Sequence, residues 1–170
     1  LVLDWLHSAG QLQDTIAVFI NPGNPAEQHI PAAPIESYGP REAQRSWEYD
    51  RLTADYGRFL VEDILPLVES SLDCRISAAA TDRIICGISS GGIAAFNAAW
   101  HFPNAFGNVI SHCGSFTNIW GGHHFPYLVR STPRKPIRVF LQSGENDAQT
   151  LFGDWGLANK AMASALQYAG

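Results

Sequence analysis

A short apolar run that leads through a glycine-rich turn into an alanine-rich stretch constrains the fold of this chain more than any other feature. Residues 83–87 read Arg-Ile-Ile-Cys-Gly, and residues 93–100 carry alanines at helical spacing. Small side chains let a helix lie close against a sheet. The turn between them, Gly87-Ile88-Ser89-Ser90-Gly91, brings strand and helix into direct succession, which is typical of parallel α/β sheets.

Other apolar runs extend this pattern along the chain. Strands are expected at 15–20, 108–112 and 137–141, and helices at 1–6, 49–72 and 155–168. The unbroken run at 15–20 is typical of a strand that is buried on both faces. Strands that alternate with helices predict a mostly parallel sheet, and 170 residues suit one domain. We therefore expect an α/β fold, a three-layer α/β/α sandwich over residues 1–170.

Two long segments lack periodicity and are expected to be loops. Residues 21–46 contain five prolines, and residues 114–136 are rich in glycine and proline. Loops of this length often border an active site, although a plain connector is the alternative for 21–46. Pro66, inside the helical pattern of 49–72, is expected to bend or restart that helix because proline lacks a backbone N–H.

Composition excludes several classes of protein. The net charge is −5 and the eleven Lys and Arg residues are scattered, so no basic patch for nucleic acid is expected. No run approaches the roughly 18 apolar residues of a membrane-spanning helix, and no signal peptide is recognisable, so we expect a soluble chain without a targeting segment. The three cysteines lack Cys-x-x-Cys spacing and are expected to be buried free thiols. Compartment and oligomeric state stay open.

Ser89 has the context of a catalytic nucleophile. The pattern Gly-x-Ser-x-Gly follows a strand and opens a helix, as a nucleophile elbow requires. Gly87 and Gly91 are expected to admit a backbone approach that any Cβ would block. The N–H of Ser90, at the helix N-terminus, would then face the developing oxyanion. A glycine-rich tight turn without chemistry is the alternative; a phosphate-binding loop would need a Lys at Walker spacing.

An acid is expected just past the strand at 137–141. Asp147 is the first choice, Glu145 the second, and a solvated loop carboxylate is the alternative reading. In this arrangement the chain order is Ser, then Asp or Glu, then His. All six histidines precede Asp147, so the histidine that would act as base is expected on a loop after Gly170.

The histidines that are present have other expected roles. His123 and His124 lie in the segment 114–136 and are expected either to contact substrate at a pocket mouth or to form a surface pair. His112 ends a strand and is expected to be a hydrogen-bonded structural residue. No spacing suitable for a zinc site is present, and neither a metal nor an organic cofactor is expected.

Several motifs in order resemble the enterochelin esterase-like branch of the α/β-hydrolases, which is related to the esterase D and feruloyl esterase families. The resemblance covers nearly the whole chain and rests on Phe19–Gly23, Arg45–Asp50, Phe59–Pro66, Gly87–Gly92, Gly114–Phe116 and Gly144–Asp147. It implies an α/β-hydrolase fold with Ser89 as nucleophile and Asp147 as acid. It also implies that a first strand with the second oxyanion donor, and a last strand with the histidine, lie outside residues 1–170, so that the chain is a fragment.

The resemblance also implies that Arg45 and Glu48 lie near the active site, where they would brace the pocket; an exposed ion pair is the alternative. Trp120, like Trp47 and Phe125, is expected either to contact an aryl or carbohydrate ligand or to pack in the interior. These residues would then border the candidate substrate pocket.

The expected function is hydrolysis of a carboxylic ester through an acyl-enzyme. The substrate would be a small-molecule or carbohydrate-linked ester, such as a siderophore lactone or a feruloyl or acetyl ester. A non-catalytic binding or interaction domain of the same fold is the alternative. Without the histidine, the 170-residue chain alone is expected to show little or no turnover.

Overall fold

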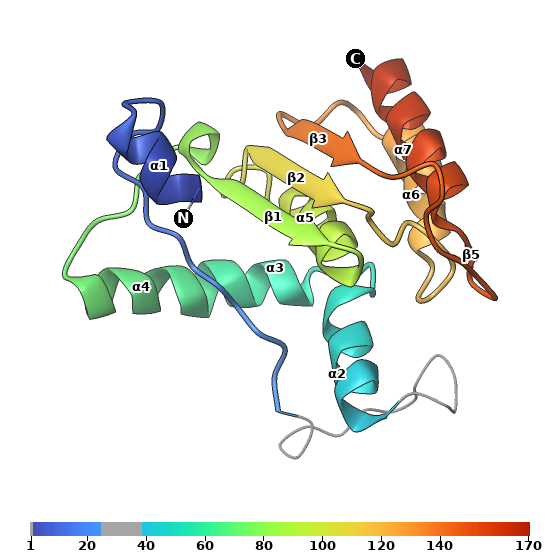
Figure 1. Cartoon of the computed structure of the whole chain (residues 1–170), viewed down its shortest axis with the longest axis horizontal. Helices are drawn as coiled ribbons and strands as arrows, with labels where there is room; N and C mark the ends of the chain where they lie inside the picture. Colours follow the sequence, from blue (N-terminus) through green and yellow to red (C-terminus); the bar gives the residue numbers. More distant parts are fainter. Residues whose placement is uncertain (1, 25–38) are drawn as a thin grey trace.

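The computed structural model describes residues 2–24 and 39–170. Figure 1 shows the helices and strands along the chain. In order they are α1 (Val2–Ser8), α2 (Pro40–Tyr49), α3 (Asp55–Phe59), the π-helical turn η1 (Leu60–Ile64), α4 (Leu65–Leu72), η2 (Ala80–Asp82), β1 (Ile84–Ile88), α5 (Ser90–His101), β2 (Asn108–His112), η3 (Gly122–His124), α6 (Phe125–Ser131), β3 (Arg138–Gln142), β4 (Gln149–Thr150), β5 (Gly153–Asp154) and α7 (Trp155–Ala169).

The central sheet has the strand order β1-β2-β3, and both pairs of neighbours are parallel. The register pairs Ile88 with His112 and His112 with Gln142, so the three strands end at one edge. Residues that follow these strands therefore meet at that edge, where α/β sheets bind their ligands. The predicted mostly parallel sheet is confirmed, and a short antiparallel hairpin, β4–β5, stands beside it.

The core lies on one face of the sheet, against α5. Phe96 of α5 is fully buried and meets Phe116 and Phe125 edge to face, with ring centroids 5.6 and 5.0 Å apart. Helices α6 and α7 complete this layer, and Met162 and Ala165 of α7 are also fully buried. Each buried large apolar side chain contributes about 1.5–3 kcal/mol to folding, so this cluster anchors the sheet.

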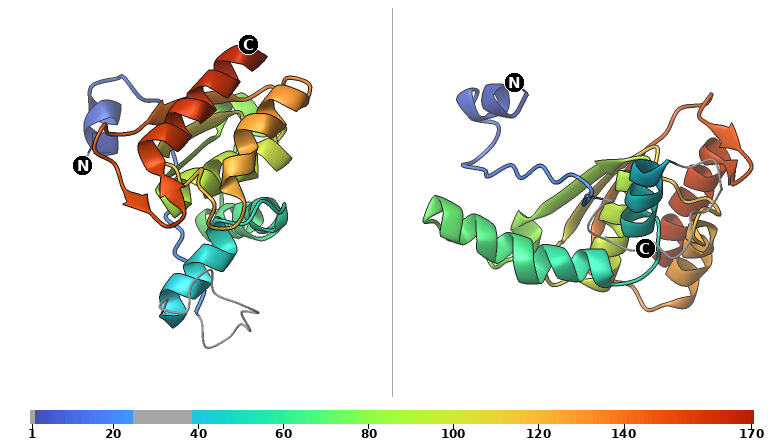
Figure 2. Two further views of the ribbon diagram at one scale, coloured as in Figure 1. Left: turned by 90° about the vertical axis from the view of Figure 1, so that its right-hand side faces the viewer. Right: turned by 90° about the horizontal axis from the view of Figure 1, so that it is seen from below.

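The opposite face of the sheet is more open. Ile84, Ile88 and Phe140 on that face are 60%, 67% and 56% exposed. Figure 2 shows α1 on the side of the sheet opposite to α5 and α6, and none of the described α1 residues is buried. The second helical layer of the predicted sandwich thus consists of α1 alone within the described residues. The three cysteines are free, as predicted, but they are not all buried, since Cys86 is exposed.

The prediction of a buried strand at 15–20 is wrong. The segment forms no strand, and Ile16, Val18 and Phe19 are 44%, 45% and 90% exposed. A strand needs a hydrogen-bonded ladder as well as apolar side chains, and this segment pairs with no described strand. Its end is held at Ile20, whose carbonyl oxygen accepts a hydrogen bond from the Tyr49 hydroxyl at 3.3 Å.

Helices also occupy parts of the two predicted loops. Helix α2 begins inside the predicted loop 21–46, at Pro40, and ends past it, at Tyr49. Residues 25–38, with Pro25, Pro31 and Pro34, are outside the described residues. Segment 114–136 contains η3 and α6. The predicted helix at 49–72 begins at Asp55, and the π-helical turn η1 directly precedes the α4 turn that carries Pro66. A wider turn accommodates the missing proline N–H, which agrees with the predicted restart.

Within residues 2–24 and 39–170, no helix combines the length and the apolar character that crossing a membrane requires. The longest, α7, has 15 residues.

Candidate active site

Ser89 occupies a strained turn between β1 and α5. Its φ is 55° and its ψ is −120°, a conformation that costs a residue with a side chain about 1–3 kcal/mol. Its N–H donates to the His112 carbonyl oxygen at 2.9 Å, and its own carbonyl oxygen accepts from the N–H groups of Gly92 and Ser115 at 2.9 and 3.1 Å. These bonds to β2, α5 and the loop after β2 offset the strain and fix the turn.

The glycines around Ser89 have unequal roles. A Cβ on Gly87 would overlap the Gly91 carbonyl group, and a Cβ on Gly92 would lie 2.7 Å from Ser111 Oγ. A Cβ on Gly91 itself would meet nothing within 4 Å. The prediction of a close approach is therefore confirmed at Gly87 and wrong at Gly91, which supplies the backbone that Gly87 approaches.

The Ser89 hydroxyl lies beside a second hydroxyl. Ser89 Oγ and Ser115 Oγ are 3.3 Å apart, and the indole N–H of Trp155 donates to Ser115 Oγ at 3.2 Å. The indole occupies one of the two acceptor positions of Ser115 Oγ, and either hydroxyl can donate to the other. When Ser115 donates, the Ser89 proton is available for transfer to a base.

Ser90, which begins α5, is buried at 4% exposure. The first N–H groups of a helix have no partner inside the helix and carry the positive end of its dipole. The Ser90 hydroxyl donates to Asp50 Oδ2 at 3.0 Å. Sequence reasoning missed Asp50, because nothing in the pattern of α2 distinguishes this carboxylate from a solvated one.

Asp50 is a buried acid with 1% exposure. Desolvation by burial raises the pKa of Asp50 to about 6, against the lowering effects of hydrogen bonding by Ser46 and Ser90 and of the charge of Arg45. Ser46, one turn earlier in α2, accepts a hydrogen bond from the Trp120 indole N–H at 3.0 Å. The carboxyl group thus belongs to a chain of polar contacts beneath the turn.

Asp147 lies past the end of β3, at the same sheet edge as Ser89, with β2 between them. Its carboxylate accepts from Ser143 Oγ at 2.7 Å and from the Ala148 N–H at 2.8 Å. These hydrogen bonds, that of Ser143 foremost, lower the pKa of Asp147. The group therefore stays ionised near neutral pH, as a carboxylate that orients a histidine must.

A thiol adjoins the Asp147 carboxylate. Desolvation, followed by the hydrogen bond and charge of Asp147, raises the pKa of Cys113. Cys113 has a φ of 47° directly after β2. The second acid that the sequence offers, Glu145, is exposed.

No described histidine is hydrogen-bonded to Ser89 or Asp147. His112 Nδ1 lies 3.1 Å from Gln142 Oε1, in agreement with a structural role, and His123 is exposed on η3. His29 is outside the described residues. Among the described residues, no group of three or more His, Cys, Asp and Glu is placed to hold a metal ion.

Arg45 and Glu48, one turn apart on α2, form no ion pair with each other. The Glu48 carboxylate instead accepts from the Gly23 N–H at 3.1 and 3.0 Å and from the Gln44 side chain, and so ties α2 to the segment after residue 20. Arg45 is exposed and, with Gly87 and Gly91, lines a hollow of about 320 Å³ beside the turn.

Trp120 is engaged with α2 on two sides. Besides its hydrogen bond to Ser46, its ring meets Trp47 edge to face at 5.5 Å. Trp120 therefore packs the loop after β2 against α2, which is one of the two roles expected for it.

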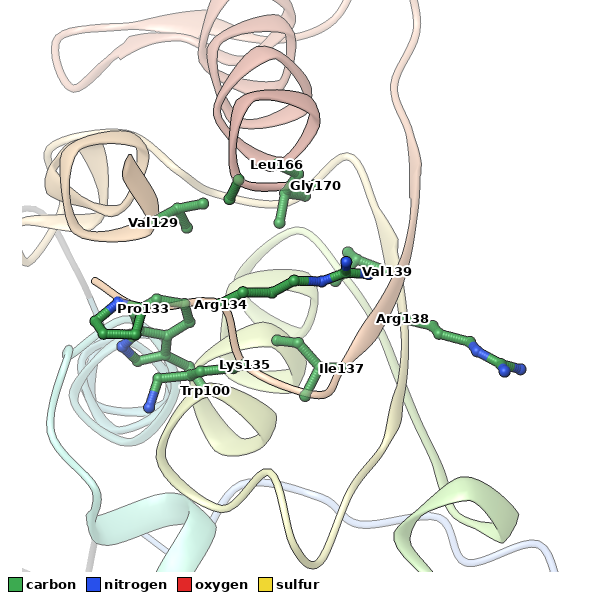
Figure 3. A pocket seen from close by; sticks show the side chains of 11 residues that line it. Trp100, Val129, Pro133, Arg134, Lys135, Ile137, Arg138, Val139, Leu166 and Gly170 are labelled. Carbon is green, nitrogen blue, oxygen red and sulfur yellow. The ribbon is translucent and has the colours of Figure 1, made fainter. Parts of the chain in front are cut away.

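A second hollow lies away from this site. It has a volume of about 220 Å³, and its lining includes Trp100 of α5, Ile137 just before β3 and Leu166 of α7 (Figure 3). Because Ser89 and Asp147 follow the opposite ends of the strands, this hollow is not part of the candidate active site.

Comparison with known proteins bears on both fold and family. Residues 2–167 match the model of the esterase family described as "Putative esterase". No curated protein matches the sequence. Among solved structures, the enterobactin esterase of Shigella flexneri in the presence of 2,3-dihydroxy-N-benzoyl-glycine is similar, with 25% identity and a TM-score of 0.59 over 73% of this chain and 32% of that chain.

The same Shigella flexneri enzyme in the presence of enterobactin matches with 25% identity and a TM-score of 0.59, over 72% of this chain and 31% of that one. The chain therefore spans about a third of the length of these structures. Together with the parallel sheet and the strand–turn–helix at Ser89, the match over residues 2–167 shows that the chain belongs to the esterase family of the α/β-hydrolase superfamily.

Proposed function

We propose that this chain contains the nucleophile, Ser89, and the acid, Asp147, of a serine carboxylic-ester hydrolase. The observation that carries the proposal is the strained Ser89 turn, with φ 55° directly after a sheet strand. Natural chains keep such strain where it serves a site, and here it presents a hydroxyl beside the N-terminus of α5. The Ser90 N–H is proposed as one oxyanion donor.

The proposed reaction has two steps. Ser89 Oγ attacks the ester carbonyl carbon while its proton passes to a histidine, and the alcohol leaves with that proton. Water then attacks the acyl-serine, the histidine again takes a proton, and the carboxylic acid leaves as Ser89 regains its hydrogen. Asp147 orients the histidine, which we place after Asp147 along the chain and outside these 170 residues, in the order usual for α/β-hydrolases.

For the substrate we propose a small ester with a catechol-bearing acyl group. The support is the similarity to an enterobactin esterase whose structures were determined in the presence of enterobactin and of 2,3-dihydroxy-N-benzoyl-serine. Feruloyl and acetyl esters on sugars are the competing substrates. Turnover of all three classes by the full-length protein, compared as kcat/KM, ranks them, and a higher value for a feruloyl or acetyl ester would overturn the catecholate assignment.

A fluorophosphonate probe tests the nucleophile in the full-length protein. Attack by Ser89 on phosphorus displaces fluoride and leaves a stable adduct, which mass spectrometry places on the peptide that contains Ser89. We expect labelling of the wild type and none of Ser89→Ala. The matched control is Ser131→Ala, because Ser131 is an exposed serine on α6. Equal labelling of wild type and Ser89→Ala would contradict the assignment of Ser89 as the nucleophile. Labelling of neither protein would contradict the mechanism and favour a non-catalytic binding domain.

A further inference from the structure

Asp50 directly follows α2 and lies beneath the start of α5. It is 1% exposed, and the Ser90 hydroxyl donates to its Oδ2 at 3.0 Å. Ser90 is also the residue whose N–H is the proposed oxyanion donor. A hydrogen bond to the side chain of Ser90 restrains the backbone of the same residue, and with it the direction of the N–H.

The position of Asp50 is itself fixed from α2. Its N–H donates to the Ser46 carbonyl oxygen at 3.0 Å, and the Ser46 hydroxyl oxygen accepts from the Trp120 indole. Because the indole leaves the Ser46 proton free, that proton can point to the carboxyl group. Asp50 Oδ1 has no hydrogen-bond partner among the described residues. Burial of a carboxylate with one unsatisfied oxygen is unfavourable. The packing of α2 does not by itself require a carboxylate at this position.

Resting on the proposed function, we infer that Asp50 is a positioning residue of the oxyanion hole: its carboxylate holds Ser90 so that the Ser90 N–H faces the ester oxygen. Asp50 does not touch substrate. An ionised acceptor makes a hydrogen bond roughly twice as strong as a neutral one, so the hold is strongest when Asp50 is charged. The charged group that acts on it is Arg45 of α2, while Ser46 and Ser90 are neutral donors.

The test compares Asp50→Asn with wild type in the full-length protein. The amide keeps size and shape but is a weaker acceptor. Loss of one oxyanion donor lowers kcat about 10²–10³-fold in other serine hydrolases, and misdirection of one should cost less, about tenfold, with KM unchanged. Affinity for an aryl boronic acid, whose adduct places a charged oxygen in the oxyanion hole, should fall by the same factor. Asp55→Asn is the matched control, since Asp55 is exposed and pairs with Arg51 on the surface.

A double-mutant cycle with Ser90→Ala separates positioning from general stability. If Asp50 acts through Ser90, the double variant loses no more kcat than the worse single variant. Additive losses, or wild-type kcat in Asp50→Asn, would overturn the inference. If Asp50→Asn does not fold, Ser90→Ala carries the test alone: wild-type kcat there overturns the inference. If the wild type neither turns over ester nor reacts with the fluorophosphonate, the proposed function is contradicted. That result is distinct from those that overturn only the inference about Asp50.

Discussion

The two regions that hold Ser89 and Ser90 are stabilised by opposite means. The turn from β1 into α5 is fixed by close approach of backbone, with Gly87 against Gly91 and an almost wholly apolar helix behind it. Helix α2 is fixed by buried polar side chains, among them Gln44, Ser46 and the following Asp50. Steric fit tolerates little change of size, whereas polar contacts respond to charge and pH, so the two regions should fail in different ways.

The largest expected effect tests the steric side. In Gly87→Ala the new Cβ would overlap the Gly91 carbonyl, and backbone cannot move aside as a side chain can. We expect a loss of about 4–5 kcal/mol in the free energy of unfolding, measured by denaturant titration, together with loss of labelling at Ser89.

Gly91→Ala is the matched control for that substitution. Its Cβ meets nothing within 4 Å, and Gly91 lies inside α5, where alanine is favoured over glycine by about 0.5–1 kcal/mol. The expected change in stability is therefore small and of opposite sign. Equal losses in both variants would mean that close approach does not distinguish the two glycines.

The difference between the regions also explains what the sequence could predict. β1, β2, β3, α5 and α7 lie close to their predicted bounds because apolar and small residues repeat at strand or helix spacing. The first two turns of α2 were predicted as loop because its buried face carries Gln44 and Ser46, which leave no apolar stripe. The apolar run at 15–20 failed in the opposite way, because it has the pattern of a strand but forms none. An apolar pattern alone does not reveal whether a neighbouring strand is available to pair with it.

The same reasoning applies to the site. Ser89 and Asp147 follow strand ends, and parallel register places such residues at one edge. Asp50 is connected to Ser90 by a hydrogen bond across 40 positions of sequence. Its position relative to Ser90 depends on how α2 packs against α5, which no local spacing encodes.

The second prediction tests the polar side through pH. The folded-state pKa of Asp50 is about 6, above its ordinary value of 3.8, so the folded protein binds the proton more tightly than the unfolded chain does. Stability from this group is therefore present at low pH and is lost as pH rises from about 4 to 6. Over that window Asp50→Asn should gain about 3 kcal/mol relative to wild type.

Denaturant unfolding of both proteins at pH 4 and pH 8 measures this gain. Asp55→Asn, at an exposed position, should track the wild type at both pH values. A difference between Asp50→Asn and wild type that is independent of pH would contradict burial of an ionised group. The predicted combination of higher stability and lower kcat at pH 8 is the trade-off expected where a strained or desolvated group serves a site.

The smallest expected effect concerns how α2 is held. Trp120→Phe removes the indole N–H that donates to Ser46 but keeps an aromatic ring against Trp47. One neutral hydrogen bond contributes about 1 kcal/mol, and we expect that loss in the free energy of unfolding. In a cycle with Ser46→Ala, a coupling energy of about 1 kcal/mol would assign the loss to this bond, and none would assign it to ring packing. Since Ser46 also lowers the pKa of Asp50, Ser46→Ala should extend the pH window of the Asp50→Asn advantage to higher pH and enlarge the advantage. The Trp120–Ser46 contact and the buried charge are thus coupled, whereas the steric contacts at Gly87 do not depend on pH.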